Sequence, residues 1–401
     1  MSIYLLATLD TKGPDAAFVR DRLVELGRDV VVIDTGCIGK AAFPAEVTRE
    51  SVFVAAGTTL AAVQAQKDRG AAVTKAAVGA TTIVLDAFKK RQVDGVIALG
   101  GSAGTTIGTA VMRALPIGVP KLMVSTLASG DVRKWVGDKD ILMLNPVVDI
   151  AGINRISRQI LSNAASAMWG MVQHRPTGCS EDKPLVAATM FGVTTLCVQH
   201  AREVLEAAGY EVLIFHATGN GGQAMESLIR EGLIAGVLDL TTTELADDLV
   251  GGVLSAGPKR LTAAAESGVP QVVSVGATDM VNFWAPDTIP IEFKDRKFHK
   301  HNAAVTLMRT TVEESKLLGQ EIGHKVSTTR GAAAILLPLR GVSAIDCEGE
   351  PFDDPIARKA LFDAIRSSHG RVELLEIDAH INDNAFAEAA AKKLLQLMKG
   401  K

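Results

Sequence analysis

The residues best suited to chemistry in this chain form a glycine-rich loop that follows an apolar segment at residues 96–99. The loop reads Gly100-Gly101-Ser102-Ala103-Gly104-Thr105-Thr106 and leads into a segment with helical spacing. Glycines let the backbone approach an anion closely, and free N–H groups at the start of a helix hold phosphate. No Gly-Lys-Ser/Thr follows, so this is not a Walker A loop. We interpret it as a phosphate-binding loop; the alternative is a tight turn that needs small residues only for packing.

The same loop satisfies Gly-x-Ser-x-Gly, the nucleophile elbow of α/β-hydrolases, with Ser102 as the nucleophile. A serine nucleophile requires a histidine base, but no histidine precedes His174 in the chain. A histidine of the second half, such as His216 or His299, would have to supply that base. A serine hydrolase therefore stays open as an alternative to phosphate binding.

Polar residues after other apolar segments of the first half extend this candidate site. Lys12 can neutralise a phosphate and Asp10 can hold a metal ion, whereas Asp34 ends a segment where an acid often binds ribose hydroxyls. Each of them could instead be a solvated loop residue or a helix cap. Together these positions predict the nucleotide-contacting residues Asp10, Thr11, Lys12, Asp34, Gly36, Gly100, Gly101, Ser102, Ala103, Gly104, Thr105, Ser125 and Thr126.

The second half carries a glycine loop of its own, Gly219-Asn220-Gly221-Gly222-Gln223-Ala224, which matches the loose dinucleotide pattern Gly-x-Gly-x-x-Ala. Asp239 lies 20 residues beyond Gly219, as that pattern requires. The loop follows the second strand of its domain rather than the first, so we favour an anion or substrate loop over a nicotinamide site. Residues Thr241-Thr242-Thr243-Glu244 have the spacing of a helix capping box.

Candidate catalytic residues of the second half gather in and around a polar segment that begins at Asp279 and includes His299 and His301. Arg309 follows it and can bind a carboxylate or phosphate through two hydrogen bonds. The pair His299-x-His301 lacks a third ligand, so we assign no metal site to it. We take His216, Asp279, His299 and Arg309 as candidate catalytic residues, acting on a small polar or acidic metabolite.

The elements that position these residues are apolar strands separated by helical stretches. Strand-like segments of the first half lie at residues 3–8, 29–34, 95–99 and 121–125. Those of the second half lie at residues 185–189, 211–215 and 236–240, followed by Gly268-Val269-Pro270 before a valine-rich strand. Apolar rather than alternating strands predict parallel sheets covered on both faces. We predict two Rossmann-like, doubly wound α/β domains related by internal duplication.

We place the first domain at residues 1–175 and the second at residues 183–401, facing each other across a cleft. The polar segment 174–184, which contains two prolines, is the expected linker. An amphipathic C-terminal helix at residues 384–398 could pack back onto the first domain. Ligands of open α/β sheets lie beyond the carboxyl ends of the strands, so we expect the site there.

The composition narrows the function classes. The chain has 401 residues, of which 47% are hydrophobic and 22% charged, as in globular proteins of two or three domains. A net charge of −3 and 4% aromatic residues argue against a nucleic-acid groove. The four cysteines form no Cys-x-x-Cys pair, and no apolar run approaches the ~18 residues of a membrane helix. We therefore expect a cytoplasmic protein that binds neither nucleic acid nor membrane.

Several motifs together resemble the ATP-binding family of the tomato mosaic virus resistance protein, whose bacterial members form an uncharacterised protein family. These motifs are Thr8-Leu9-Asp10-Thr11-Lys12-Gly13, Gly100-Gly101-Ser102-Ala103-Gly104-Thr105, Phe215-His216-Ala217-Thr218-Gly219, Asp279-Met280-Val281-Asn282-Phe283 and His301-Asn302. The resemblance covers essentially the whole chain. It implies two Rossmann-like domains, ATP bound on the first one, and a homodimer. The plant protein inhibits viral RNA replication and carries an extra barrel domain, so antiviral inhibition is not carried over to this chain.

With this resemblance, the predicted function is binding of ATP, with magnesium, on the loop of residues 100–106. As an enzyme, the protein would carry out phosphoryl or nucleotidyl chemistry on the metabolite, where positioning and charge neutralisation do most of the work. The alternative is an ATP-responsive binding module without turnover, which closes around its ligand. The density of His, Asp and Arg in the second half favours the enzyme.

Overall fold

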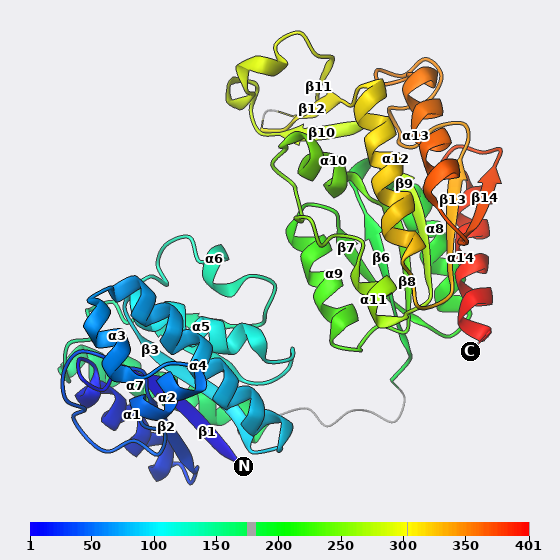
Figure 1. Cartoon of the computed structure of the whole chain (residues 1–401). Coiled ribbons are helices and arrows are strands. Elements are labelled where there is room, and N and C mark those ends of the chain that lie inside the picture. The colour runs from blue at the N-terminus through cyan, green and yellow to red at the C-terminus, as the bar shows by residue number, and fades with distance from the viewer. Residues whose placement is uncertain (175–181, 303, 401) are drawn as a thin grey trace. The chain divides into compact units, whose positions relative to one another are not determined.

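Figure 1 shows the computed structural model of the chain, which describes residues 1–174, 182–302 and 304–400. The chain divides into two compact units, Met1–Gly178 and Cys179–Lys401. These bounds lie close to the predicted domains at residues 1–175 and 183–401. Most of the predicted linker, residues 174–184, lies outside the described residues.

The first unit is built around a parallel sheet with the strand order β2-β1-β3-β4-β5. Its strands are β1 (Ser2–Ala7), β2 (Val30–Asp34), β3 (Val93–Gly100), β4 (Lys121–Ser125) and β5 (Leu142–Leu144). Nearly every residue of β1, β3 and β4 is buried. Strands that are covered on both faces must be apolar along their whole length, which is the pattern that the sequence showed.

Helices cover both faces of this first sheet (Figure 1). They are α1 (Gly13–Glu25), α2 (Arg49–Ala55), α3 (Leu60–Gln66), α4 (Arg69–Lys89), α5 (Ser102–Ala114), α6 (Arg133–Val136) and α7 (Arg155–Gln173). Val19 of α1 and Leu161 of α7 are buried against one face of the sheet. Phe53 of α2, Val84 of α4 and Ile107 of α5 are buried against the other.

Helix α4 corrects one expectation from the sequence. By length and composition alone it could cross a membrane, although we expected no apolar run of that length. Ala72, Ala76, Ala80 and Val84 on one of its faces are buried in the core of the first unit. A core helix of this kind passes the same test of length and composition, so α4 is weak evidence for a membrane span.

The second unit contains a longer parallel sheet with the order β14-β13-β9-β8-β6-β7. Its strands are β6 (Leu185–Met190), β7 (Glu211–His216), β8 (Gly236–Thr241), β9 (Gln271–Gly276), β13 (Ala333–Pro338) and β14 (Glu373–Ile377). An α/β fold with two parallel-sheet domains is therefore confirmed. When the strands of each sheet are numbered in their order along the chain, the first sheet has the order 2-1-3-4-5, and the second, read from β7, has the order 2-1-3-4-5-6. A common order is expected from internal duplication, but the duplication itself stays a prediction because such orders also recur independently.

Helices again cover both faces of the second sheet. They are α8 (Thr195–Ala207), α9 (Asn220–Arg230), α10 (Thr243–Val250), α11 (Ala263–Ser267), α12 (Val312–Ser327), α13 (Pro355–Ser368) and α14 (Asn384–Lys399), with short 3-10 turns η1 (Gly192–Thr194), η2 (Pro286–Thr288) and η3 (Ile291–Phe293). The C-terminal helix α14 packs beside α8 (Figure 1), and its Phe386 and Leu394 are buried there. The apolar face of α14 is thus buried inside the second unit.

A small antiparallel sheet extends the second unit after β9. It pairs β10 (Met280–Phe283), β12 (Thr306–Arg309) and β11 (Phe298–Lys300) in that order. In Figure 1 this sheet lies beyond α10, at the end of the unit. The polar segment from Asp279 to Arg309 that the sequence singled out forms this sheet and its loops.

Candidate functional site

A cavity of about 330 Å³ lies at the carboxyl ends of β1, β2 and β3 in the first unit; we call it the loop cavity. The strand order reverses between β1 and β3, and ligands of open α/β sheets bind at such a switch point. Of the predicted contacts, those that line it are Asp10, Thr11, Lys12, Gly100, Gly101, Ser102, Ala103 and Gly104. Its other lining residues are Thr8, Thr35, Cys37, Ile38, Arg69, Ala72, Val73, Ile107 and Asp149.

The glycines of the loop have two different reasons to be glycines. A Cβ on Gly100 would lie 2.9 Å from the Cα of Gly104, and a Cβ on Gly104 would lie 3.0 Å from the carbonyl oxygen of Leu99. These two glycines are therefore needed for close packing of the turn. A Cβ on Gly101 would meet no atom nearer than the Thr126 hydroxyl at 3.7 Å. Packing therefore does not require a glycine at position 101, which lines the loop cavity.

The first turn of α5 begins directly at this loop. Its amide groups at Ser102, Ala103 and Gly104 precede the first residue whose N–H can bond back along the helix. Thr105 is that residue, and its N–H donates to the Gly101 carbonyl at 2.8 Å. The three earlier amides belong to residues that line the loop cavity, where they can receive an anion.

Thr105 and Ser125 hold the loop in shape and do not line the loop cavity. Both side chains are buried, and their hydroxyl oxygens lie 2.6 Å apart. The Thr105 hydroxyl donates to the Gly101 carbonyl at 2.7 Å, so the Ser125 hydroxyl must donate to Thr105. Thr126, the third predicted contact of this group, donates its N–H to the Gly100 carbonyl at 3.4 Å. Through these hydrogen bonds, the three residues fix the conformation of the glycine loop.

Asp34 is also turned inward, contrary to the ribose-binding role expected from the sequence. It is buried, and its carboxylate accepts from the Arg49 Nε at 2.7 Å and from the Leu9 N–H at 3.1 Å. The same Arg49 lies 3.6 Å from the Asp10 carboxylate. A Cβ on Gly36 would come within 2.7 Å of the Asp10 carboxylate, which explains that glycine. Arg49 thus ties together the loops that follow β1 and β2.

Three charged side chains line the loop cavity besides Asp10. Lys12 donates a hydrogen bond to the carbonyl of Ile150, which holds the ammonium at the edge of the cavity. Arg69 and Asp149 are exposed, and neither was predicted. Arg69 is the first residue of α4, where the helix dipole disfavours a cation, and that unusual placement was the one signal available in the sequence.

The second glycine loop is filled by the protein itself. The Glu244 carboxylate accepts from the Gly219 N–H at 2.7 Å and from the Gly222 N–H at 3.1 Å. A Cβ on Gly222 would lie 2.3 Å from that carboxylate. The anion position at the start of α9 is therefore occupied by a side chain of α10, and the prediction of a ligand loop here is wrong.

Glu244 belongs to a buried charge cluster around Arg260, which is itself fully buried. Arg260 lies 2.6 Å from Glu244, 2.5 Å from Asp239 and 3.5 Å from Glu226. Burial raises the pKa of Glu244 above its ordinary value, and the Arg260 charge opposes that rise. Asp239, the acid of the dinucleotide pattern, is engaged here as well. The predicted capping box is absent, because Thr242 at the start of α10 makes no side-chain cap.

Two of the candidate catalytic residues, Asp279 and Arg309, meet in a second buried cluster. Arg309 donates to the Asp279 carbonyl at 3.2 Å and to the Asp346 carboxylate at 3.2 Å. The Ser343 hydroxyl donates to the Asp279 carboxylate at 2.8 Å. Burial, together with the nearby Asp346, raises the pKa of Asp279 to about 7. Both Asp279 and Arg309 are buried, and the Asp279 Oδ1 has no hydrogen-bond partner among the described residues.

The two candidate histidines lie in different places. His299 packs against the Phe352 ring with 6.2 Å between ring centroids, and the Phe352 carbonyl accepts from Arg309 at 2.8 Å. His299 is thus next to the Asp279 cluster. His216 ends the edge strand β7, is exposed, and packs against Phe191. No group of three His, Cys, Asp or Glu side chains that could hold a metal ion occurs among the described residues.

Comparisons with known proteins identify relatives of the chain. Residues 1–177 match the N-terminal domain of an uncharacterised protein family, UPF0261, and residues 183–398 match its C-terminal domain. A UPF0261 protein of Clostridium tetani is 50% identical over 99% of this chain and 98% of its own length. One from Rhizobium meliloti is 47% identical over 97% of each chain.

A ToMV resistance protein of Solanum lycopersicum is 44% identical over 82% of this chain, but over 45% of its own length. More than half of that plant protein thus has no counterpart here. Among solved structures, a thioesterase domain from the curacin biosynthetic pathway is 10% identical, with a TM-score of 0.28, over 54% of this chain and 92% of that one. A likeness this low says nothing about function.

Proposed function

This chain belongs to the uncharacterised protein family UPF0261, and from that premise we propose that its first unit binds ATP in the loop cavity. The phosphates would lie against the loop of residues 100–104 and the first turn of α5. The observation that carries the proposal is the cavity at the switch point of the sheet, which is lined both by the glycine loop and by Ser102, Ala103 and Gly104, whose amides at the start of α5 have no partner along the helix.

The charges around the loop cavity support a phosphate ligand. Lys12 and Arg69 supply two cations, and Thr8, Thr11 and Ser102 supply hydroxyl donors at the same cavity. Two carboxylates, Asp10 and Asp149, line it as well. Magnesium is bound in many nucleotide sites by one or two carboxylates together with phosphate oxygens. The exposed Asp149 fits that ion by type, whereas the Asp10 carboxylate already accepts from the Ile38 and Gly39 N–H groups. Bound there, magnesium would neutralise phosphate charge.

Turnover is a separate part of the proposal. Phosphoryl or nucleotidyl transfer to a small polar or acidic metabolite would need catalytic groups that reach the substrate. Asp279 and Arg309 are buried and hydrogen-bonded within the second unit, which supports the alternative of an ATP-responsive module without turnover. Release of ADP or pyrophosphate during incubation with candidate acids distinguishes the two. The homodimer is tested by sedimentation of the full chain.

One observation favours the alternative function of a serine hydrolase: Ser102 is exposed and lines the loop cavity. The histidine of the first unit, His174, follows α7 and packs against Trp169. A fluorophosphonate probe tests this function directly. Labelling of the wild type that is lost in Ser102→Ala would support a nucleophilic serine, and absence of labelling would count against it.

Calorimetric titration with ATP, with and without magnesium, tests the proposed binding. We expect binding by the wild type and a loss of at least about tenfold in affinity for Gly101→Val, which places a branched side chain on the loop that lines the cavity. Gly170→Val is the matched control, because a Cβ on Gly170 meets nothing within 4 Å and Gly170 does not line the cavity. A folded, nucleotide-free wild type that binds no ATP would contradict the proposal.

Alkylation of cysteines locates the ligand independently. Cys37 lines the loop cavity, and burial together with the Asp10 carboxylate raises the pKa of its thiol, so labelling should be slow at pH 7 and faster near pH 9. We expect ATP to slow the alkylation of Cys37 near pH 9. Alkylation of the half-buried Cys347 in the second unit should not change. Equal effects of ATP on both cysteines would place the ligand elsewhere.

A further inference from the structure

The small antiparallel sheet of the second unit borders a cavity of about 490 Å³, which we call the small-sheet cavity. Its walls come from the turns η2 and η3 and from the strands β11 and β12, whose sheet Figure 1 shows beyond α10. Its lining residues are Pro286, Ile289, Pro290, Ile291, Lys294, Phe298, Lys300 and Thr306. A cavity of this size can enclose a small molecule. It shares no residue with the loop cavity, so a ligand bound here does not depend on the proposed ATP site.

Most of the wall of the small-sheet cavity is apolar and held in place. Pro286 and Pro290 have a fixed backbone φ, so this part of the wall loses little freedom when a ligand binds. Ile289 and Phe298 are partly buried and pack against the core of the second unit. Ile291, by contrast, is 79% exposed. A ligand with an apolar body would remove that surface from water, and such burial stabilises a complex.

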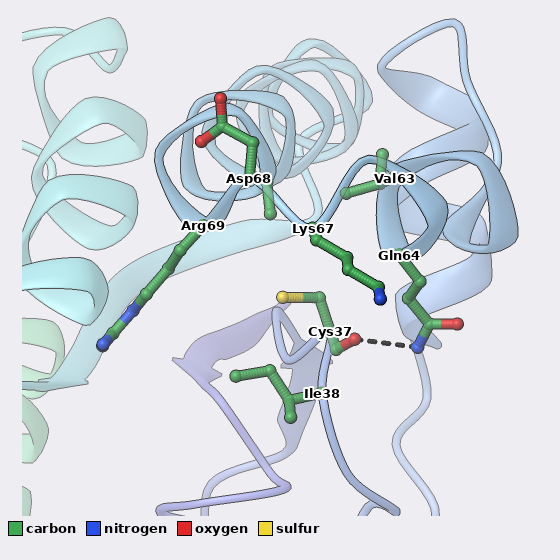
Figure 2. A pocket seen from close by; sticks show the side chains of 8 residues that line it. Cys37, Ile38, Val63, Gln64, Lys67, Asp68 and Arg69 are labelled. Atoms are coloured by element: carbon green, nitrogen blue, oxygen red, sulfur yellow. Dashed lines mark hydrogen bonds between the residues drawn. The ribbon is translucent and has the colours of Figure 1, made fainter.

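Two lysines give this cavity a positive charge. Lys294 and Lys300 are exposed, and neither forms an ion pair with a described residue. No acidic residue lines the small-sheet cavity in the described part of the chain. A cavity of about 430 Å³ in the first unit differs in this respect, because Asp68 lines it together with Lys67 and Arg69 (Figure 2). The small-sheet cavity carries charges of one sign only, which favours an anion.

Thr306 provides an independent observation that points to a ligand. It is only 3% exposed, and its hydroxyl has no hydrogen-bond partner among the described residues. Buried hydroxyl groups normally have a partner. Lys300 lies directly opposite Thr306 in the pairing of β11 with β12, and residues paired in this way share one face of a sheet. The Thr306 hydroxyl and the Lys300 ammonium can therefore reach the same anionic group.

We propose that the small-sheet cavity binds a small amphipathic carboxylate, a molecule with an apolar body and one carboxylate head. The body would lie along Ile291 and Phe298. The head would accept from the Thr306 hydroxyl and pair with Lys294 and Lys300, because carboxylate oxygens only accept. Phosphate sites commonly use a glycine loop at the start of a helix, whereas these walls come from 3-10 turns and strands.

Titration of the full chain with two amphipathic acids, followed by ligand-observed NMR, tests the proposal. Octanoate has a linear body and hydrocinnamate an aromatic one. We expect at least one of them to bind at least about tenfold more tightly than acetate, which lacks the apolar body. The same acid should bind at least about threefold more tightly than the corresponding alcohol, which lacks the charge.

Substitutions separate the contributions of charge and apolar surface. Lys294→Met should lower the affinity for the acid by about two- to fivefold and leave that for the alcohol unchanged. Lys297→Met is its matched control, because Lys297 is exposed in the same segment and does not line the cavity. Ile291→Ala should weaken both ligands by about three- to tenfold. Its control, Ile356→Ala on α13, should weaken neither, although Ile356 is 71% exposed.

Thr306→Val distinguishes a ligand contact from a role in folding. The hydroxyl has no partner in the folded chain, so its replacement by a methyl group should not lower the free energy of unfolding. The affinity for the acid should nevertheless fall by about threefold or more. Lower stability with unchanged affinity would contradict the proposed position of the carboxylate.

The proposal is overturned if the folded wild type binds neither acid at millimolar concentration. Equal affinities for an acid and its alcohol would overturn it too, since the lysines would then have no role. Equal losses for Lys294→Met and Lys297→Met would show that the charge acts from outside the cavity, which also contradicts it.

Discussion

Two glycine loops at the carboxyl edges of two similar sheets serve opposite purposes in this protein. The loop of residues 100–104 in the first unit faces a cavity, and the space at Gly101 is empty. The loop of residues 219–222 in the second unit encloses the carboxylate of Glu244. Both offer amide groups at the start of a helix, so both are suited to anions. The difference is that only the second unit supplies the anion from its own chain.

The source of that anion explains the difference. Glu244 comes from the start of α10, directly after β8, the third strand of the second sheet. At the matching place after β3, the first unit carries its glycine loop instead. A glutamate after the third strand can reach the neighbouring loop, whereas a glycine there leaves room for a ligand. A glycine pattern thus predicts an anion position without telling whether protein or ligand fills it.

Removal of the internal anion is expected to have the largest effect. Glu244→Ala would leave the buried Arg260 and the amides of Gly219 and Gly222 with fewer partners, so the free energy of unfolding should fall by about 3–5 kcal/mol. Urea unfolding followed by circular dichroism measures this loss. The control Glu313→Ala, on an exposed face of α12, should change it by less than about 0.5 kcal/mol. Similar losses for both variants would contradict a structural role of Glu244.

The buried acids of the second unit should make the free energy of unfolding depend on pH. The open glycine loop of the first unit gives no such expectation. Asp279 has a pKa of about 7 in the folded chain against an ordinary value of 3.8, so the folded state holds a proton that the unfolded state has released. The stabilisation is present below about pH 4 and is lost as the pH rises through 7. Loss of the proton from Asp279 alone should lower the free energy of unfolding by roughly 2–3 kcal/mol as the pH rises from 5 to 8.

Urea unfolding at several pH values tests this prediction with Asp279→Asn. Asp247, whose pKa burial raises to about 7, acts in the same direction, so the variant should reduce the pH dependence without abolishing it. Asp378→Asn, a change at an exposed ion pair, should leave the pH dependence as it is. A wild type that becomes more stable from pH 5 to pH 8 would show that the sign is wrong.

The smallest expected effect comes from a matched pair of substitutions in the two loops. Gly222→Ala would bring a methyl group within 2.3 Å of the Glu244 carboxylate, and we expect a loss of about 1–3 kcal/mol in the free energy of unfolding. Gly101→Ala has no atom nearer than 3.7 Å to its methyl group, so its stability should stay within about 0.5 kcal/mol of the wild type. Equal losses at both positions would remove the distinction between a filled and an open loop.

The sequence predicted the parts of the candidate site that depend on short stretches of chain. Lys12 and the loop of residues 100–104 follow apolar segments directly, and the carboxyl ends of parallel strands meet at one edge, so both reach the loop cavity as expected. It missed Arg69, Asp149, Cys37 and Ile38, which reach the cavity from longer connections. The paths of such connections depend on what they pack against.

What the sequence determined by itself is the fold class and the positions of the glycine turns that follow the strands, because apolar runs and glycine turns act over a few residues. Tertiary structure decided which polar groups remain free to meet a ligand. Asp34 is taken by Arg49, Thr105 by Ser125, and Glu244 by the second glycine loop. Each of these pairs joins residues 15 or more positions apart. The partner of a buried polar group depends on which residues the fold brings next to it, and spacing along the chain does not reveal that partner.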